Sequence, residues 1–277
     1  MSTPISYWGG KQSIMHVLLP MVPPLEQREV YTEVFFGGGS LFWEINPASP
    51  AETINDKLDI VVNFYRVLKT RYAELKVLID ASLISRTMHK EASKIAKGYL
   101  PASDVYYAWA FWYCCNFSYG NKFDAGTKYS NSGRSCGPDI IANKKREFTD
   151  LLVARIEHAY IEHDDAIKIL RSRNVVKGFH YEDPPYMNAD QGHYGGYTTE
   201  MFRELLEWNA TECKGRFLLS NYPSDILTEY IEKYKWKTKT VKHSSKHTTG
   251  GGHKPKPEVL VWNYTEPAFQ PSLPFDL

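Results

Sequence analysis

The sequence predicts an α/β protein in which a mainly parallel sheet, covered by helices, is interrupted by an insertion. Strand-like runs alternate with helical patterns near both ends of the 277-residue chain, an order that is typical of parallel sheets. The middle differs, because an aromatic helical segment is followed by a long polar stretch without periodicity. We therefore expect one discontinuous domain, formed by residues 1–80 and 156–277, with a mainly helical insert over residues 81–155.

The composition is that of a globular protein, with 43% hydrophobic and 23% charged residues and a net charge of +1. No window approaches the roughly 18 apolar residues that a membrane-spanning helix needs. The first residues lack the basic and apolar segments of a secretory signal. The four cysteines show no CxxC spacing. We therefore expect a cytoplasmic protein with reduced cysteines and no metal site.

Two strands and a helix are predicted before the insertion. Residues 29–36 are rich in β-branched and aromatic side chains and run into a glycine turn, which is typical of a strand. Residues 52–55 form the second predicted strand and end at Asp56. Apolar side chains then recur every three or four positions from Val61 to Ile79, so the spacing predicts one amphipathic helix.

The insert combines a predicted buried helix over residues 104–115 with an irregular segment over residues 116–143. A polar segment of this length in a compact protein is usually a functional loop or a disordered one. Basic and aromatic side chains alternate in and just after it, a pattern that suits contact with nucleic acid, although an ordinary mobile loop is the alternative. The candidate DNA contacts here are Lys122, Lys128, Arg134 and Lys144. Arg134 is the expected reader of a base edge, since arginine on guanine is the commonest specific contact.

The last part of the chain returns to alternating strands and helices. The segments predicted here are strands over residues 159–162, 179–182 and 216–219 and a helix over residues 200–213. Residues 235–241 and 257–264 are expected to pair as antiparallel strands. The segment from Lys233 to Lys256 holds eight lysines and no acidic residue, which indicates either a phosphate-facing surface or a solvated hairpin. Its candidate DNA contacts are Lys242, Lys246 and Lys254.

A glycine motif, Phe35-Phe36-Gly37-Gly38-Gly39-Ser40, begins at the end of the first predicted strand. It lacks the spacing of a phosphate-binding loop and the third glycine of a full GxGxxG motif. Its glycines nevertheless allow the backbone to approach a cofactor closely. Asp56 lies seventeen residues after Gly39, at the end of the second strand, where nucleotide-binding folds hold ribose hydroxyls. The alternative is a plain turn followed by a helix-capping aspartate.

A second motif, Asp183-Pro184-Pro185-Tyr186, follows the strand predicted over residues 179–182. The two prolines force a sharp turn at the strand end. The turn then brings a carboxylate, a backbone carbonyl and an aromatic ring into one small pocket. Two neighbouring acceptors suit an exocyclic amine, and the ring suits a flat base. The motif therefore predicts Asp183, Pro184 and Tyr186 as catalytic residues.

Together, these motifs resemble those of the Dam-like DNA adenine-N6 methyltransferases. The segments that carry the resemblance, in this order, are Tyr7–Lys11, Phe36–Ser40, Asp56, Asp183–Tyr186 and Ser220–Tyr222. The resemblance covers nearly the whole chain and is loosest over residues 80–150. It implies a Rossmann-like methyltransferase fold with an inserted target-recognition domain, S-adenosylmethionine as methyl donor and double-stranded DNA as substrate. Because the target amine is paired in a duplex, we expect its adenine to be flipped out, with Tyr186 stacked on it.

The resemblance also assigns roles to individual residues. Lys11 and Asp56 match cofactor contacts of the family, and Asp183 matches its catalytic aspartate. Tyr7 stands where relatives commonly carry tryptophan, and Trp8 follows as a second ring. The residues expected to bind the cofactor are Tyr7, Trp8, Lys11, Phe36, Gly37, Gly39, Ser40, Asp56 and Asp183. The alternatives are an amino-methyltransferase for cytosine N4 or RNA adenine, and an inactive DNA-binding module.

The C-terminal residues 265–277 are expected to form an extended tail outside the core, because three prolines occur within residues 267–277. Gln270, Leu273 and Phe275 resemble the short peptides that bind the bacterial sliding clamp. The alternative is a tail that is loose or folds back onto its own domain.

Overall fold

The computed structural model describes residues 2–121, 125–127, 137–186, 196–241 and 257–265. These residues form a seven-stranded sheet with the strand order β3-β2-β1-β4-β5-β7-β6. The strands are β1 (Val30–Glu33), β2 (Ala51–Asn55), β3 (Ala159–Glu162), β4 (Gly178–Glu182), β5 (Arg216–Asn221), β6 (Lys237–Val241) and β7 (Glu258–Trp262). The first five are parallel, and β7 runs antiparallel to both β5 and β6. The predicted strands and the antiparallel pair are thus confirmed.

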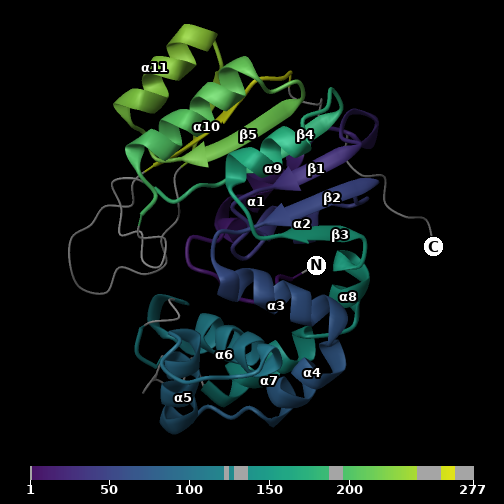
Figure 1. The fold of residues 1–277 in the computed structure, drawn as a ribbon, viewed down its shortest axis with the longest axis vertical. Coiled ribbons are helices and arrows are strands. Elements are labelled where there is room, and N and C mark those ends of the chain that lie inside the picture. Colours follow the sequence, from purple (N-terminus) through teal and green to yellow (C-terminus); the bar gives the residue numbers. More distant parts are fainter. Residues whose placement is uncertain (1, 122–124, 128–136, 187–195, 242–256, 266–277) are drawn as a thin grey trace.

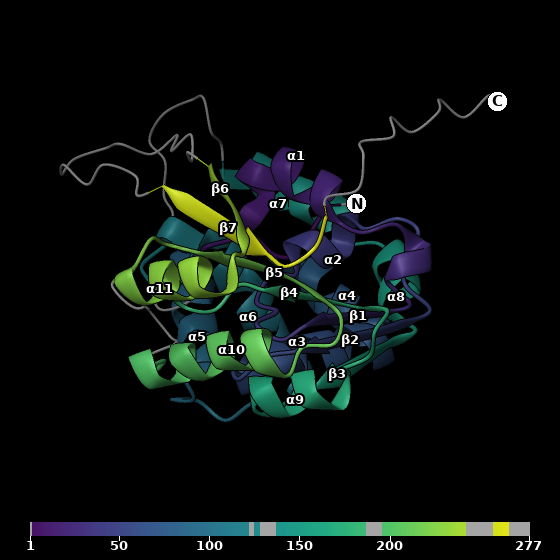
Figure 2. The ribbon, with the colours of Figure 1, turned by 90° about the horizontal axis from the view of Figure 1, so that it is seen from above.

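Helices cover both faces of this sheet (Figures 1 and 2). They are α1 (Met15–Leu18), α2 (Ser40–Glu44), α3 (Asp59–Thr70), α4 (Tyr72–Ala81), α5 (Arg86–Ala96), α6 (Asp104–Phe117), α7 (Gly137–Glu147), α8 (Leu151–Ile156), α9 (Ala166–Ser172), α10 (Thr199–Thr211) and α11 (Asp225–Tyr234). Short 3₁₀ turns are η1 (Lys11–Ile14), η2 (Leu19–Met21), η3 (Leu25–Gln27) and η4 (Tyr119–Asn121). One apolar core lies under α9, α10 and α11, and a second lies on the other face with α1, α2 and α3.

The strand order determines where a ligand can bind. From β1 the chain moves outward to β2 and β3, and it later returns to place β4 on the other side of β1. The direction of the connections therefore reverses between β1 and β4. In open α/β sheets, ligands bind in the crevice at such a switch point, beyond the carboxyl ends of the strands. Glu33 ends β1, and Asp183 directly follows β4, so both lie at this crevice.

The insert packs against α3 and shares a core with the sheet (Figure 1). Helix α6 is buried on nearly all sides, because its sequence is apolar around its whole circumference. The rings of Phe64 in α3 and Phe111 in α6 lie 5.7 Å apart. The side-chain amide of Asn63 also donates to the carbonyl of Asp104 at 2.9 Å. The predicted boundaries at residues 81 and 155 remain predictions, since the apolar contacts continue across them.

Two predicted elements are wrong in their extent. The single helix expected from Val61 to Ile79 is two helices, because the backbone of Arg71 leaves the helical region at φ −137° and ψ 34°. The segment expected to be irregular up to residue 143 contains the first half of α7. A proline and an aspartate in the first turn are N-terminal helix signals that the sequence does carry there. Every helix in the described part of the chain is too short or too polar to cross a bilayer.

We expect Phe111→Ala to lower the free energy of unfolding by about 3–5 kcal/mol, because the ring is fully buried between the insert and α3. Tyr106→Ala in the same helix is the control, since its ring is 47% exposed and its loss should cost less than about 1 kcal/mol. Denaturant unfolding measures both. Two separate transitions in the wild type would contradict a core shared by the sheet and the insert.

Candidate active site

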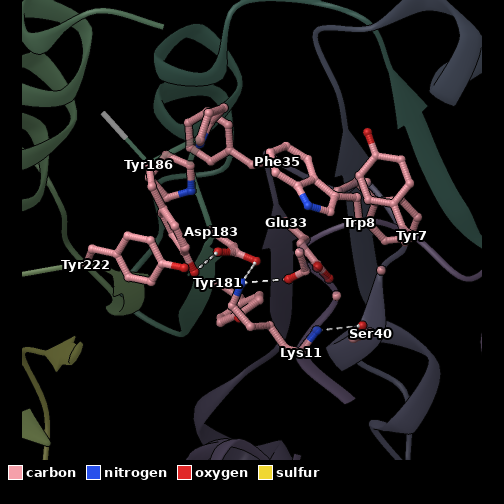
Figure 3. Close-up of a pocket in the computed structure, with 18 residues that line it drawn as sticks. Tyr7, Trp8, Lys11, Glu33, Phe35, Ser40, Tyr181, Asp183, Tyr186 and Tyr222 are labelled. Atoms are coloured by element: carbon pink, nitrogen blue, oxygen red, sulfur yellow. Dashed lines mark hydrogen bonds and ion pairs between the residues drawn. The ribbon is translucent and has the colours of Figure 1, made fainter. Parts of the chain in front are cut away.

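A pocket that is partly open to solvent lies at the switch point between β1 and β4 (Figure 3). It collects nearly all of the residues that the sequence analysis expects to be catalytic or to bind the cofactor. The predicted residues that line it are Tyr7, Trp8, Lys11, Phe36, Gly37, Gly39, Ser40, Asp183, Pro184 and Tyr186. Tyr186 and Tyr222 lie on one side of Asp183, and Trp8 and Tyr7 lie on the other (Figure 3). The N-terminal segment and the glycine turn therefore form the wall opposite the two tyrosines.

The glycine turn requires glycine at Gly38 and Gly39, because side chains would not fit there. Gly39 has a φ of +61°, and a Cβ on it would lie 2.3 Å from the ring of Phe36. A Cβ on Gly38 would lie 2.7 Å from the Cβ of Tyr7. The turn can therefore pack directly against the N-terminal segment, which leaves a backbone-lined surface where a cofactor can approach closely.

Asp56 is the predicted residue that does not line this pocket. One of its carboxylate oxygens accepts the N–H of Gly37 at 2.8 Å, and the other accepts the N–H of Leu58 at 2.9 Å. Burial raises the pKa of Asp56 to about 6, although these hydrogen bonds oppose the shift. The aspartate thus fixes the glycine turn from behind. It lines a second pocket, and Phe35 and Pro185 line both pockets.

The second pocket lies at the carboxyl ends of β2 and β3. Its walls are mainly apolar, and Asp164 and Asp165 add carboxylates to them. Tyr197 closes it near Phe35, whose ring centroid is 5.7 Å away in an edge-to-face contact. Phe35, Asp56 and Pro185 are the residues of this pocket that the sequence analysis places in or beside a motif, and the other lining residues belong to no recognised motif.

Lys11 and Asp183 form the central ion pair of the first pocket, with Nζ 2.5 Å from Oδ2. Lys11 is 3% exposed, and its Nζ also donates to the carbonyl of Gly9 at 3.0 Å. Burial favours a neutral lysine, but the carboxylates of Asp183 and Glu258 outweigh it and raise the pKa of Lys11. Burial raises the pKa of Asp183 to about 6; Lys11 opposes this shift and Glu258 adds to it. The pair therefore keeps a buried ammonium charged beside the motif carboxylate.

Tyr186 points into the pocket rather than away from it (Figure 3). Its hydroxyl lies 3.0 Å from Oε1 of Glu258 and 3.3 Å from Oδ1 of Asp183. Because the hydroxyl has one proton, it can donate to only one of these carboxylates at a time. Its ring lies 4.1 Å from that of Tyr222, tilted by 47°. Two aromatic faces therefore lie beside the carboxylate.

Two buried carboxyl groups of this site are missed by the sequence analysis. Glu33, which is 2% exposed, ends β1 and accepts a hydrogen bond from the hydroxyl of Tyr31 at 2.7 Å. Burial raises its pKa to about 8, so it is mainly protonated at neutral pH. Its place just before the glycine motif is a signal that could have identified it. Glu258 comes from β7, far along the chain, and carries no comparable local signal.

Most of the predicted DNA contacts fall outside the described residues, namely Lys122, Lys128, Arg134, Lys242, Lys246 and Lys254. Lys144 lies on α7 and forms an ion pair with Glu147 at 2.9 Å. Its contact with DNA stays a prediction. Among the residues that the structure describes, no group of three histidine, cysteine or acidic side chains could hold a metal ion.

The family model of the D12 class N6 adenine-specific DNA methyltransferases matches residues 7–249. The chain belongs to this family. This methyltransferase therefore transfers a methyl group to N6 of adenine in DNA and uses S-adenosylmethionine as donor. Its seven-stranded sheet agrees with the Rossmann-like fold that the motifs imply. The family assignment also decides against cytosine N4, RNA and an inactive module. A comparison with curated proteins finds no match.

We expect Glu33→Gln to stabilise the methyltransferase more at pH 8 than at pH 5. The pKa of Glu33 is about 8 in the folded state, against an ordinary value of 4.5. Between these values the folded state holds a proton that the unfolded state releases, so stability falls as the pH rises through this window. Glutamine is neutral throughout and removes that fall. The free energies of unfolding of the wild type and the variant at the two pH values test this. If the variant differs from the wild type by the same amount at pH 5 and pH 8, the prediction is wrong.

Proposed function

We propose that the methyltransferase acts on an adenine flipped out of duplex DNA, whose amine binds between the Asp183 carboxylate and the Pro184 carbonyl. One observation carries this proposal. Asp183 lies at the switch point of the sheet, in a pocket that also contains the glycine turn and two aromatic rings. Such a pocket has acceptors for an amine, stacking faces for a base and a close backbone surface for a cofactor.

The two adjoining pockets fit the two halves of S-adenosylmethionine, which supplies a methyl group on a positively charged sulfur. The second pocket, with apolar walls and Asp56, suits the nucleoside part. The first pocket offers Glu33, whose ionised form a cationic group would favour, and the backbone of the glycine turn, which carries no side chains. Phe35 and Pro185 line both pockets and would contact the cofactor between its two halves.

The chemistry assigned to the residues of this chain is activation and alignment of the amine. The lone pair of an exocyclic amine is delocalised into the adenine ring, so the nitrogen is a weak nucleophile. Hydrogen bonds to Asp183 and the Pro184 carbonyl favour a more tetrahedral nitrogen and stabilise charge that develops there. Lys11 keeps Asp183 ionised and fixed in place. The remaining contribution is positioning.

Base flipping costs roughly a few kcal/mol, because it breaks pairing and stacking. The rings of Tyr186 and Tyr222 beside Asp183 can offset part of this cost by stacking on the adenine.

Helix α5 provides a described surface for the DNA backbone. It packs on α6 through His89, Ala92, Ile95 and Ala96, with its opposite face exposed. The basic residues on that exposed face are Arg86, Lys90, Lys94 and Lys97. They recur at steps of three and four, which places them in one stripe. The helix lies at the outer end of the insert, on the side of the molecule where the strands have their carboxyl ends (Figure 1). We assign this stripe to phosphate contact.

The clamp-binding prediction for Gln270, Leu273 and Phe275 lies outside the described residues, and no comparison supports it. A DNA substrate fits a cytoplasmic location in a bacterial or phage-infected cell, which we retain as part of the proposal.

Asp183→Ala should reduce methylation of DNA at least about a hundredfold, because the group that accepts the target amine is lost. Transfer of labelled methyl from S-adenosylmethionine to DNA measures this rate. DNA affinity should stay within a few-fold of wild type. Asp80→Ala on the surface of α4 is the control and should be fully active. Activity within tenfold of wild type would refute the assignment of Asp183.

The double variant Lys90→Ala, Lys94→Ala should weaken binding to all duplex sequences to a similar degree. The slope of log affinity against log salt should decrease in magnitude by about two, since each phosphate contact contributes about 0.9. The matched control is the double variant Lys177→Ala, Lys214→Ala. These two lysines precede β4 and β5 and lie at the edge of the sheet opposite the carboxyl ends of the strands. Equal slopes for wild type and the α5 variant would show that the stripe is merely solvated.

A further inference from the structure

We propose that Glu258 is a positioning residue for methyl transfer, which orients Lys11 and Tyr186 around Asp183. The inference deepens the proposed function and rests on the role given there to Asp183. Neither sequence motif includes Glu258. It enters the site from a strand that no motif marks, seventy-two residues after Tyr186.

The antiparallel direction of β7 brings Glu258 to the pocket. Asn221 at the carboxyl end of β5 pairs with Val259, and Val241 at the end of β6 pairs with Glu258. The amino end of β7 therefore lies at the same edge of the sheet as the carboxyl ends of the parallel strands. A glutamate at this position has its side chain only 1% exposed.

Donors from three separate segments converge on one oxygen of Glu258. Oε1 accepts hydrogen bonds from the hydroxyl of Ser220 in β5 and from that of Tyr186 at 3.0 Å. Nζ of Lys11 lies 3.6 Å from the same oxygen and 2.5 Å from Asp183. Burial of a carboxylate is costly unless donors compensate it. Here the compensating donors are two groups that themselves contact Asp183, so Glu258 restricts the positions of both.

The charges around Asp183 give this arrangement a measurable consequence. The titratable groups that face it are Lys11, Glu33, Tyr181, Tyr186, Tyr222 and Glu258. Glu33 is mainly protonated at pH 7, and burial raises the pKa values of the tyrosines. Lys11 therefore favours an ionised Asp183, while Glu258 opposes it. Removal of the Glu258 charge must lower the pKa of Asp183 below its present value of about 6.

The test measures kcat/KM against pH for the full-length methyltransferase with DNA and S-adenosylmethionine. Glu258→Gln keeps the shape and the acceptor oxygen but removes the charge. We expect the acidic limb of its kcat/KM–pH profile to move to lower pH by at least about half a pH unit. We also expect kcat to fall about tenfold while KM for DNA changes less than about threefold, because orientation is lost rather than binding.

Glu52→Gln is the matched control, since Glu52 is also buried but pairs with Arg155 at the opposite end of β2. This variant should be less stable than the wild type, and the acidic limb of its kcat/KM profile should lie at the wild-type pH. Ser220→Ala serves if Glu258→Gln does not fold. Loss of the Ser220 hydroxyl removes a hydrogen bond that stabilises the ionised carboxylate of Glu258. The acidic limb should therefore move to lower pH, as in Glu258→Gln, but by a smaller amount.

Three outcomes overturn the inference. The first is an unchanged acidic limb in a folded Glu258→Gln variant, and the second is an unchanged acidic limb in Ser220→Ala where Glu258→Gln does not fold. The third outcome is that Glu52→Gln moves the acidic limb as far as Glu258→Gln does. If Asp183→Ala is inactive in these cases, the inference about Glu258 fails and the proposed function stands. If Asp183→Ala retains activity, both fail.

Discussion

The ion pair between Lys11 and Asp183 is the interaction on which the site depends. It joins the N-terminal segment to the end of β4 and so closes one wall of the pocket. Lys11 is almost fully buried, and a buried ammonium is tolerated only where carboxylates and other acceptors surround it. Removal of one partner of such a pair typically costs about 3–5 kcal/mol. The same pair thus serves the stability of the fold and the ionisation of the motif carboxylate.

Carboxyl groups with raised pKa values are concentrated at the carboxyl edge of the sheet. Burial raises the pKa of Glu33, Asp56, Asp183 and Glu182. Such groups often mark functional sites, but Glu182 shows that the shift alone is no proof. Its side chain accepts a hydrogen bond from Asn209 of α10, on the other face of the sheet. Glu33 and Asp183 differ from Glu182 because they line the first pocket beside groups that complement them.

The sequence predicts most strands and the first pocket, because the glycine motif and the Asp-Pro-Pro-Tyr motif each follow a strand at the same sheet edge. Gly39 and Asp183 therefore meet as expected, and the N-terminal segment adds Tyr7 and Lys11 to the same pocket. Glu258 could not be predicted, since its place depends on the register of an antiparallel strand that arrives late in the chain. The break at Arg71 was missed because apolar spacing continues through it while the backbone does not.

Helix α3 connects the glycine turn of the first pocket to the insert. It begins three residues after Asp56, whose carboxylate accepts the N–H of Gly37, and its Tyr65 hydroxyl donates to the carbonyl of the same glycine at 2.9 Å. The other side of α3 packs on α6 through Phe64 and Phe111. A rigid helix with both contacts cannot tilt without disturbing the glycine turn. The position of the insert and the shape of the first pocket are therefore coupled through one helix.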